Sequence, residues 1–451
     1  MRTLFVTLFV LLTVGCAALP RGDRDAGPAE AGPPDYRWVE ALGGETLAAL
    51  VQEAWRANPG MDAALAAVAR ARAQAVIAGA ARWPQAQLAL DGSRSKSLQL
   101  GRHRLFNRFG LTAEVSWIPD LWGRAAARQR AGEADLAAAR ADLEGARLLL
   151  AADVAKQWLR RREALLQWRL AEQRRESFAA TLAVITARYR AGLVEALDVY
   201  LARENLATAE ASALAAHQTL DAAARALESL LGRFPAGAFG DEEPLGALPG
   251  PVPSRIDARV LLRRPDVQAW RQRLLAAEAR RLDAAGNRFP SFSLTARGGT
   301  QSAELNRLLD WDNLVWSLAA GLVQPLFDGG RLRAEALLAR ANEKEVLANY
   351  AKAVLAALRE VQTALAAEPL LNRQVALRQE AAEMARRAAE SSLANYRAGL
   401  IDVDALLTAQ RRAFASRGAL LSTRLARLLN RIDLHLAIGG DFVPMSGGDD
   451  H

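Results

Sequence analysis

The chain has 451 residues but only one cysteine, Cys16, and four histidines, which are scattered along its length. A single cysteine excludes an internal disulfide framework and any cysteine-rich metal site. The sequence also lacks a Gly-rich phosphate loop, a His-Glu-x-x-His motif and a nucleophile elbow, which are common signatures of nucleotide, metal and acyl chemistry. We therefore expect neither catalysis nor a bound cofactor or metal.

Lysine is scarce too, since 54 of the 58 basic side chains are arginine, and the formal net charge is +8. Such a balance is compatible with a nucleic acid partner, a membrane surface or the solvated exterior of helices. The arginines are spread along the chain and mixed with glutamate, whereas a nucleic-acid binder concentrates basic and aromatic residues on one face. We expect no nucleic acid partner, and the hydrophobic fraction of 51% favours a chain that folds.

The N-terminus has no apolar run long enough to cross a bilayer, for which about 20 residues are needed. Residues 4–12 instead form a short apolar core between a basic start and the small residues before Cys16. This pattern predicts a signal peptide over residues 1–15. The position of the cysteine resembles a bacterial lipobox, although Thr13 stands where leucine is usual. Cys16 is therefore the expected lipid attachment site, followed by a lipidated tether over residues 16–39.

Landmark residues recur along the chain at a nearly constant offset. The pentapeptide Tyr-Arg-Ala-Gly-Leu at residues 189–193 returns identically at residues 396–400, an offset of 207. A proline pair, Pro59 and Pro84, returns 206 residues later. Landmarks in one order at one spacing indicate an internal duplication. We predict repeat 1 over residues 40–235, a linker over 236–254, repeat 2 over 255–440 and a flexible tail over 441–451.

Each copy has the composition of long helices. A long proline-free stretch of the first copy is rich in alanine, leucine, arginine and glutamate, and residues 124–189 as one helix would extend about 100 Å. Gly192 would end this helix, because glycine adopts the left-handed conformation of a helix C-terminus. Shorter helices expected at residues 60–82 and 194–231 would stack end to end beside it as a two-ply rod. The second copy repeats the pattern, with a kink or break expected at Pro369.

Between the helices, apolar and polar residues alternate with a period of two, which is typical of strands with two different faces. The nine residues 109–117 suit a tilted strand that crosses a bilayer. The polar stretches at residues 93–108 and 300–313 are expected to be outward loops. The four expected strands include residues 86–90, 109–117, 292–296 and 316–322.

Four strands are too few to close a barrel with a lumen. An open sheet in hydrocarbon would leave its edges unpaired, which lipid does not tolerate. Other copies of the chain must then complete the sheet, and three copies would supply twelve strands above a continuous cylinder of helices. The alternative in a different class is a soluble periplasmic helical-rod interaction protein.

Several of these features together resemble a known family. The duplicated unit, the Arg-Arg-Pro-Asp-Val segment at residues 263–267, the two Tyr-Arg-Ala-Gly-Leu turns and the lipobox are similar to those of the TolC-like outer membrane factors (outer membrane efflux proteins), most closely the NodT/OprM-type lipoproteins. The resemblance implies a mainly α fold with a membrane β-barrel, built from two tandem helix-strand-strand-helix repeats. It further implies a homotrimer with a 12-stranded β-barrel and a long α-helical barrel, lipid-anchored in the outer membrane with an extended periplasmic part.

The resemblance also implies a function. The chain is expected to be the passive, gated exit channel of a tripartite efflux system, most similar to the RND type, for drugs or other small molecules. Its expected partners are a periplasmic adaptor protein, an inner-membrane RND-type pump and outer membrane lipid. The exit duct of a type I protein secretion system is the alternative within the channel class. No cofactor is expected besides the covalent lipid on Cys16.

By the same resemblance, the two glycine turns lie at the periplasmic mouth, where tyrosine, aspartate and arginine side chains hold the helices closed. Ile401 stands where one familiar pattern has an arginine, so that bond is not assigned. The alternative is that the tyrosines are packing residues and the aspartates are solvated. The gate candidates are Tyr189, Asp198, Tyr396, Asp402 and Asp404. The turns are expected to contact the adaptor through Arg190, Ala191, Gly192, Leu193, Arg397, Ala398, Gly399 and Leu400.

Overall fold

The structure is a computed structural model that describes residues 36–99, 102–238, 252 and 258–441. The chain divides into a unit Met1–Arg37 and a unit Trp38–His451, and apart from Arg37 the elements described below lie in the second. The predicted lipid attachment at Cys16, the predicted tether before residue 36, most of the predicted linker and most of the predicted tail lie outside the described residues.

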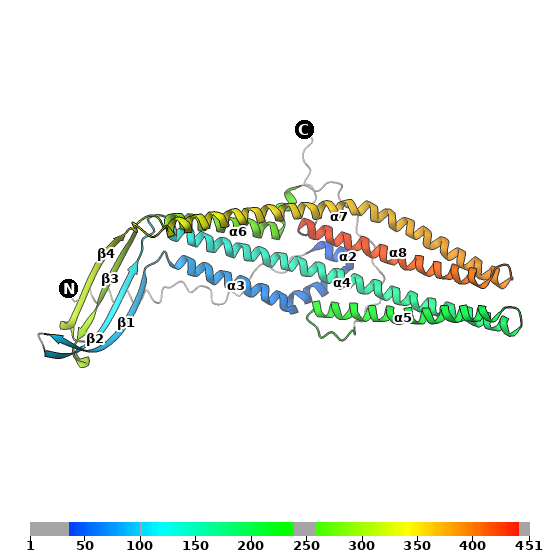
Figure 1. The fold of residues 1–451 in the computed structure, drawn as a ribbon, viewed down its shortest axis with the longest axis horizontal. Helices are drawn as coiled ribbons and strands as arrows, with labels where there is room; N and C mark the ends of the chain where they lie inside the picture. The colour runs from blue at the N-terminus through cyan, green and yellow to red at the C-terminus, as the bar shows by residue number, and fades with distance from the viewer. Residues whose placement is uncertain (1–35, 100–101, 239–251, 253–257, 442–451) are drawn as a thin grey trace, which may run out of the picture. The chain divides into compact units, whose positions relative to one another are not determined.

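The elements follow the predicted order, and the mainly helical fold with two helix-strand-strand-helix repeats is confirmed (Figure 1). The first repeat comprises α2 (Arg37–Ala57), α3 (Pro59–Ala80), β1 (Gln85–Gln99), β2 (Arg102–Trp117), α4 (Arg124–Arg190) and α5 (Ala196–Leu230). The second comprises the short turn η1 (Ala258–Arg263), α6 (Pro265–Gly286), β3 (Ser291–Ser302), the turns η2 (Leu305–Arg307) and η3 (Trp311–Asn313), β4 (Leu314–Val323), α7 (Arg331–Arg397) and α8 (Val403–Ile438).

The long helices α4 and α7 have 67 residues each, so each extends about 100 Å. Both α3 and α5 pack against α4, and both α6 and α8 pack against α7, which confirms the two-ply arrangement. The second repeat joins the first because α6 and α8 also pack against α4. Pro59 and Pro265 are the first residues of α3 and α6. Proline fits there because it lacks the backbone N–H, which would have no hydrogen-bond partner in the first turn of a helix.

Helix α2 opens the first repeat, and the sequence analysis did not predict it. Its Trp38 and Leu47 are buried, and the ring of Trp38 stacks on His435 near the end of α8, with ring centroids 5.4 Å apart. Burial lowers the pKa of His435 to about 4, so the ring is neutral at neutral pH and Nδ1 donates to the carbonyl of Gly440, 3.0 Å away. The backbone amide of Trp38 donates to the carboxylate of Asp441. These contacts bind the start of α2 to the end of the second repeat.

The sheet is antiparallel throughout, in the order β1-β2-β3-β4. Its register places Leu88, Ala113, Gly298 and Trp316 in one row, and the neighbouring row of the same face contains Leu90, Leu111, Thr300 and Leu314. The alternate rows form a polar face, in which the guanidinium of Arg297 bonds the carboxylate of Glu114 at 2.9 Å. The predicted separation into an apolar and a polar face is therefore confirmed.

One sequence prediction about local structure was wrong, and another was wrong in part. Residues 93–108 do not form a loop, because β1 and β2 continue their pairing through Gln99 and Arg102. Helix α7 is one continuous helix through Pro369, so the expected break is absent, while a kink at Pro369 stays a prediction. Pro369 is exposed, so water can satisfy the carbonyl of Leu365 that the missing amide leaves free. The second predicted loop differs less, since only its first three residues belong to β3 before η2 and η3 follow.

Candidate functional site: the paired helix turns

The two Tyr-Arg-Ala-Gly-Leu segments form the same helix-ending turn. Gly192 and Gly399 have φ angles of 73° and 75°, in the left-handed region that glycine tolerates. The amide of Leu193 donates to the carbonyl of Arg188 and that of Gly192 to Tyr189, both at 2.9 Å. The second turn repeats both hydrogen bonds from the corresponding amides. This is the Schellman arrangement, and it reverses the chain from each long helix into its return helix.

Replacing Gly399 with alanine is expected to destabilise this turn by about 1–2 kcal/mol, because an L-residue pays that cost in the left-handed conformation. Among the described residues, apart from the two chain neighbours, no heavy atom lies within 4 Å of the added Cβ, so backbone strain is the whole effect. Asparagine tolerates the same conformation, and Gly399→Asn should therefore lose less. Thermal unfolding monitored by circular dichroism compares the stability of the two variants. If both lose the same stability, the left-handed backbone at Gly399 is not the cause.

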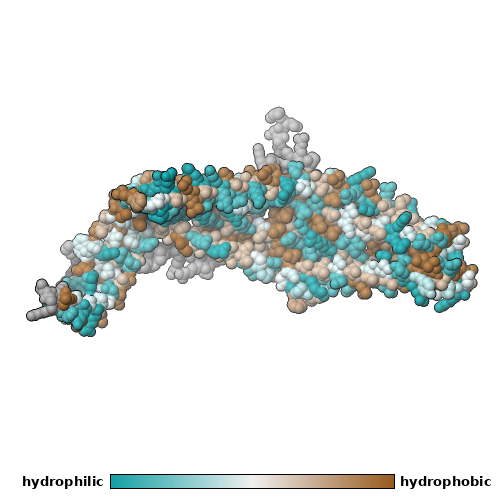
Figure 2. Space-filling view, in the orientation of Figure 1, coloured by the Kyte–Doolittle hydropathy of each residue, from teal (hydrophilic) through white to brown (hydrophobic). Residues whose placement is uncertain are grey.

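The eight turn residues predicted to contact an adaptor are all exposed. Hydrophobic side chains gather on the visible face near the end of the helices that carries the turns (Figure 2). Leu193 and Leu400 are the large apolar members of the two turns, and Leu197 and Tyr200 of α5, which follows the first turn, are exposed as well. An apolar exposed surface of this kind is typical of a protein contact site.

The two tyrosines of the duplicated turns lie in different environments. Tyr396 is 3% exposed, whereas Tyr189 is 46% exposed. Tyr396 belongs to an apolar cluster with Phe178 and Ile185 of α4 and with residues of α5 and α8, so its burial depends on contact between the two repeats. The structure therefore assigns Tyr396 a packing role that Tyr189 lacks.

Arg188 joins the ends of α4 and α7. Its Nη1 donates to the carbonyl of Tyr396 at 2.6 Å, and its guanidinium carbon lies 4.8 Å from the centroid of the Tyr396 ring. Burial raises the pKa of the Tyr396 hydroxyl, the positive charge of Arg188 opposes this, and the carboxylate of Asp198 raises it further. The hydroxyl stays protonated at neutral pH and has no hydrogen-bond partner among the residues that the structure describes. Arg188 is a site residue that the sequence prediction missed.

The three aspartates among the gate candidates occupy different positions. Asp402 is the N-cap of α8, since its Oδ1 accepts a hydrogen bond from the amide of Ala405 at 2.8 Å. Such a cap stabilises the helix by about 1 kcal/mol, so Asp402 has a structural role whatever else it does. Asp404 is exposed in the first turn of α8, while Asp198 is half-buried in the first turn of α5, near Tyr396. The gate role of all five candidates stays a prediction.

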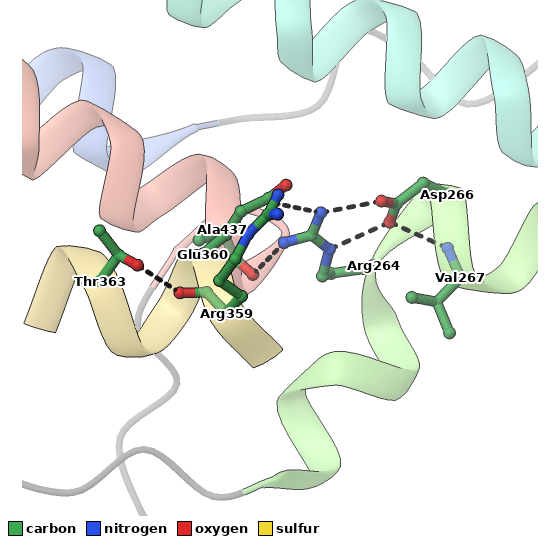
Figure 3. Close-up of polar contacts among 7 residues, drawn as sticks. All are labelled: Arg264, Asp266, Val267, Arg359, Glu360, Thr363 and Ala437. Atoms are coloured by element: carbon green, nitrogen blue, oxygen red, sulfur yellow. Dashed lines mark hydrogen bonds and ion pairs between the residues drawn. The ribbon is translucent and has the colours of Figure 1, made fainter. Parts of the chain in front are cut away.

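A second polar cluster lies where α6 meets α7 and the end of α8 (Figure 3). The buried guanidinium of Arg264 bonds both carboxylate oxygens of Asp266, at 3.0 and 2.8 Å, and Oε2 of Glu360 at 2.8 Å. Its Nη1 also donates to the carbonyl of Ala437 at 2.8 Å. Burial alone would lower the pKa of Arg264, but the bonds to Asp266 and Glu360 raise it, so the arginine keeps its charge. The Arg-Arg-Pro-Asp segment is thus an anchor for three helices.

Two further features of the described residues concern metal binding and membrane spans. They contain no group of three or more histidine, cysteine, aspartate or glutamate side chains that could hold a metal ion. One helix among them, α3, is long and apolar enough to cross a membrane, and only 11% of that apolar stretch is buried. A sheet with one apolar and one polar face, joined to long helices with exposed turns, defines a channel protein with a helical extension.

Comparison with known proteins places the chain within this class. The family described as "Outer membrane efflux protein" matches residues 50–233 and 258–440. The pyoverdine export outer membrane protein OpmQ of Pseudomonas aeruginosa is 30% identical over 90% of this chain and 87% of its own length. The cation efflux system protein CusC of Escherichia coli K12 is 27% identical over 87% of this chain and 86% of its own. The crystal structure of the outer membrane protein VceC of Vibrio cholerae has a TM-score of 0.85 and 26% identity, and the match covers 91% of this chain and 100% of that one.

The chain belongs to the outer membrane efflux protein family. The resemblance to the TolC-like outer membrane factors is thereby confirmed, as is an outer membrane location. The expectation that the protein is a channel and not an enzyme is confirmed too. Lipid attachment at Cys16 stays a prediction.

Proposed function

We propose that three copies of this chain form the exit duct of a tripartite efflux system, most similar to the RND type, that releases small molecules or ions across the outer membrane. The observation that carries the proposal is the sheet: it has separate apolar and polar faces, and β1 and β4 are edge strands without partners in the described chain. Pairing β4 of one copy with β1 of the next removes every edge, as a structure in hydrocarbon requires. Three copies then supply twelve strands, with the apolar face toward lipid.

The polar face of the sheet suits the lining of a water-filled duct. It carries the Arg297–Glu114 ion pair, which would be costly in contact with lipid. The helices continue the duct into the periplasm, where the exposed turns meet an adaptor and, through it, an inner-membrane pump. The acyl chains proposed on Cys16 would add a second attachment to the membrane.

The relatives support export of small cargo. OpmQ exports pyoverdine by its name, and CusC belongs to a cation efflux system. We infer that this chain releases cargo of that size class rather than folded or unfolded proteins. The duct itself binds no cofactor and performs no chemistry, so the energy comes from the pump.

The proposal is tested by deleting the gene in its native host and measuring the accumulation of a fluorescent efflux dye and the proteins of the culture medium. We expect dye accumulation to rise several-fold and to return to its original level with the restored gene. A Leu193→Asp/Leu400→Asp variant, altered only in the exposed turns, should reach the membrane in normal amount yet fail to restore efflux. If dye accumulation is unchanged and a secreted protein disappears from the medium, the chain serves protein secretion and not efflux.

A further inference from the structure

The hairpin of β1 and β2 carries a concentration of positive charge beyond its apolar part. Between Asp91 and Glu114 the sequence contains five arginine and lysine residues but no aspartate or glutamate, whereas charges of both signs are mixed along the helices. Because β1 follows α3 and β2 precedes α4, the bend between the two strands lies at the end of the sheet away from the helices. With the helices in the periplasm, as proposed above, this end of the sheet is outside the cell.

The register distributes these charges over the two faces of the hairpin. Phe109 continues the apolar face, and the next two rows of that face contain Arg94 and Lys96. Arg104 and Arg108 belong to the alternate rows, which continue the polar face. All four basic side chains are exposed, and none of them forms an ion pair with another residue that the structure describes. Arg94 and Lys96 therefore add unbalanced positive charge to the face that is turned toward lipid.

Aromatic residues mark the two borders of the apolar face along β2. Trp117 and Phe109 both lie on this face and are eight residues apart. This separation is about 27 Å along a strand and about 20 Å across a membrane at the usual strand tilt. The ring of Phe109 covers Gly92 of β1, since a Cβ atom built on Gly92 would be 3.2 Å from Cδ1 of that ring.

The two basic side chains lie at the outer border of the hydrocarbon. The apolar band of such barrels is about 25 Å tall and has aromatic residues at both borders. Arg94 and Lys96 are one and two rows beyond Phe109, which places them about 25 and 30 Å from Trp117 across the membrane. A lipid-facing basic side chain is costly in the middle of a bilayer, but at this height it reaches the headgroups.

We propose that Arg94 and Lys96 bind the phosphate groups of the glycolipid in the outer leaflet of the membrane. This leaflet is built from lipopolysaccharide, whose lipid A part carries phosphate groups immediately above its acyl chains. A guanidinium group binds two oxygens of one phosphate at once, and an ammonium group binds phosphate as a point charge. The proposal rests on the orientation of the sheet proposed above, with its apolar face toward lipid. Each copy of the chain then has one such site on the outside of the barrel.

The competing partner is the segment between β3 and β4 of the next copy, which has the opposite charge. Residues 303–313 contain three carboxylates, Glu304, Asp310 and Asp312, and one basic residue, Arg307. Arg307 bonds Asp310 at 3.4 Å, so two carboxylates remain. Two carboxylates do not balance the five basic residues of the β1–β2 hairpin. Most of its positive charge therefore needs an anion from outside the protein, which favours lipid over contact between copies.

Substitutions on the two faces of the hairpin test the site. The complete protein, purified in detergent and washed free of lipopolysaccharide, is titrated with fluorescent bisphosphorylated lipid A, and binding is followed by fluorescence anisotropy. We expect Arg94→Ser/Lys96→Ser to lower the affinity about 30-fold, as two basic side chains at an anionic lipid surface imply. Serine occupies residues 93, 95 and 97, so these strands accept it.

A matched control removes the same charge from the same hairpin. Arg104→Ser/Arg108→Ser changes the polar face only and should leave the affinity for lipid A nearly unchanged. Arg94→Lys/Lys96→Arg keeps both charges and should keep most of the binding. If the two serine variants lose affinity equally, lipid A responds to net charge and the assigned site is wrong. If the polar-face variant loses more, the apolar face is not the one that contacts lipid A.

Two further probes identify the ligand. Lipid A without phosphate groups should bind the unaltered protein about 30-fold more weakly and should no longer distinguish it from Arg94→Ser/Lys96→Ser. If millimolar inorganic phosphate displaces lipid A, the pair recognises a free anion and not the lipid. If Arg94→Ser/Lys96→Ser instead dissociates the oligomer, the two side chains contact the next copy. A protein that conducts but binds both forms of lipid A equally would overturn this site and leave the proposed duct intact.

Discussion

Replacing Arg264 with methionine lowers the free energy of unfolding by about 2–3 kcal/mol, because the substitution removes one partner of a partly buried charge network. Asp266 and Glu360 keep access to water, so their carboxylates can be hydrated and the loss stays below that of a fully buried pair. The carbonyl of Ala437, at the end of α8, loses its charged donor as well. We expect the three helices to separate at a lower temperature than in the unaltered chain.

The neighbouring arginine provides the control. Arg263 is exposed and adjacent in sequence, so Arg263→Met removes the same charge and the same side-chain length at a solvated position. It should change the free energy of unfolding by less than about 0.5 kcal/mol. Arg264→Lys should fall between the two, because lysine keeps the charge but cannot bond both oxygens of Asp266 at once. The free energies of unfolding of the three variants are compared by urea unfolding of the detergent-solubilised protein, monitored by circular dichroism. If Arg263→Met and Arg264→Met lower this free energy equally, Arg264 does not anchor the three helices.

Replacing Arg188 with alanine is expected to open the end of the channel that carries the turns. The substitution removes the hydrogen bond from a charged donor to the Tyr396 carbonyl and the contact with the Tyr396 ring, worth about 2 kcal/mol together. If this contact holds the closed state, the ratio of closed to open channels falls about 30-fold. Mean current through single channels should rise correspondingly.

Arg190→Ala is the matched control for this prediction. Arg190 lies two residues further along, in the exposed turn, and its loss removes the same charge from the same end of the duct. Arg190→Ala should therefore leave the open fraction nearly unchanged. If both variants open the channel equally, the effect comes from local charge and not from the contact with Tyr396. If neither does, Arg188 and Tyr396 do not take part in closing.

The bounds of the helices that the sequence predicted were accurate because proline and glycine favour particular positions at helix ends. Pro59 and Pro265 fit best in the first turn of a helix, and Gly192 and Gly399 supply the left-handed backbone at the end. The expected bounds of α3, α4 and α5 therefore fell within about two residues of those observed. The extensions of β1 and β2 were missed, because strand segments outside the hydrocarbon no longer need an apolar face. Residues 93–97 are accordingly polar on both faces.

The candidate site was less accessible to prediction. The pentapeptides around Tyr189 and Tyr396 are identical, so the difference in burial comes entirely from what packs on them. Arg188 could have been noticed, because its counterpart Asn395 breaks the duplication immediately before the identical segment. The role of Arg264 depends on Glu360 and Ala437, which are distant in sequence and carry no local signal.

The central claim, that copies of this chain form a water-filled duct through the outer membrane, is tested most directly by single-channel recording in a planar lipid bilayer. The protein purified from outer membranes should insert and give discrete, ohmic current steps, and the aspartates among the gate candidates should favour cations. The claim is contradicted if the protein retains its helix content and its oligomeric mass but never carries current, and if the Arg188→Ala variant carries none either.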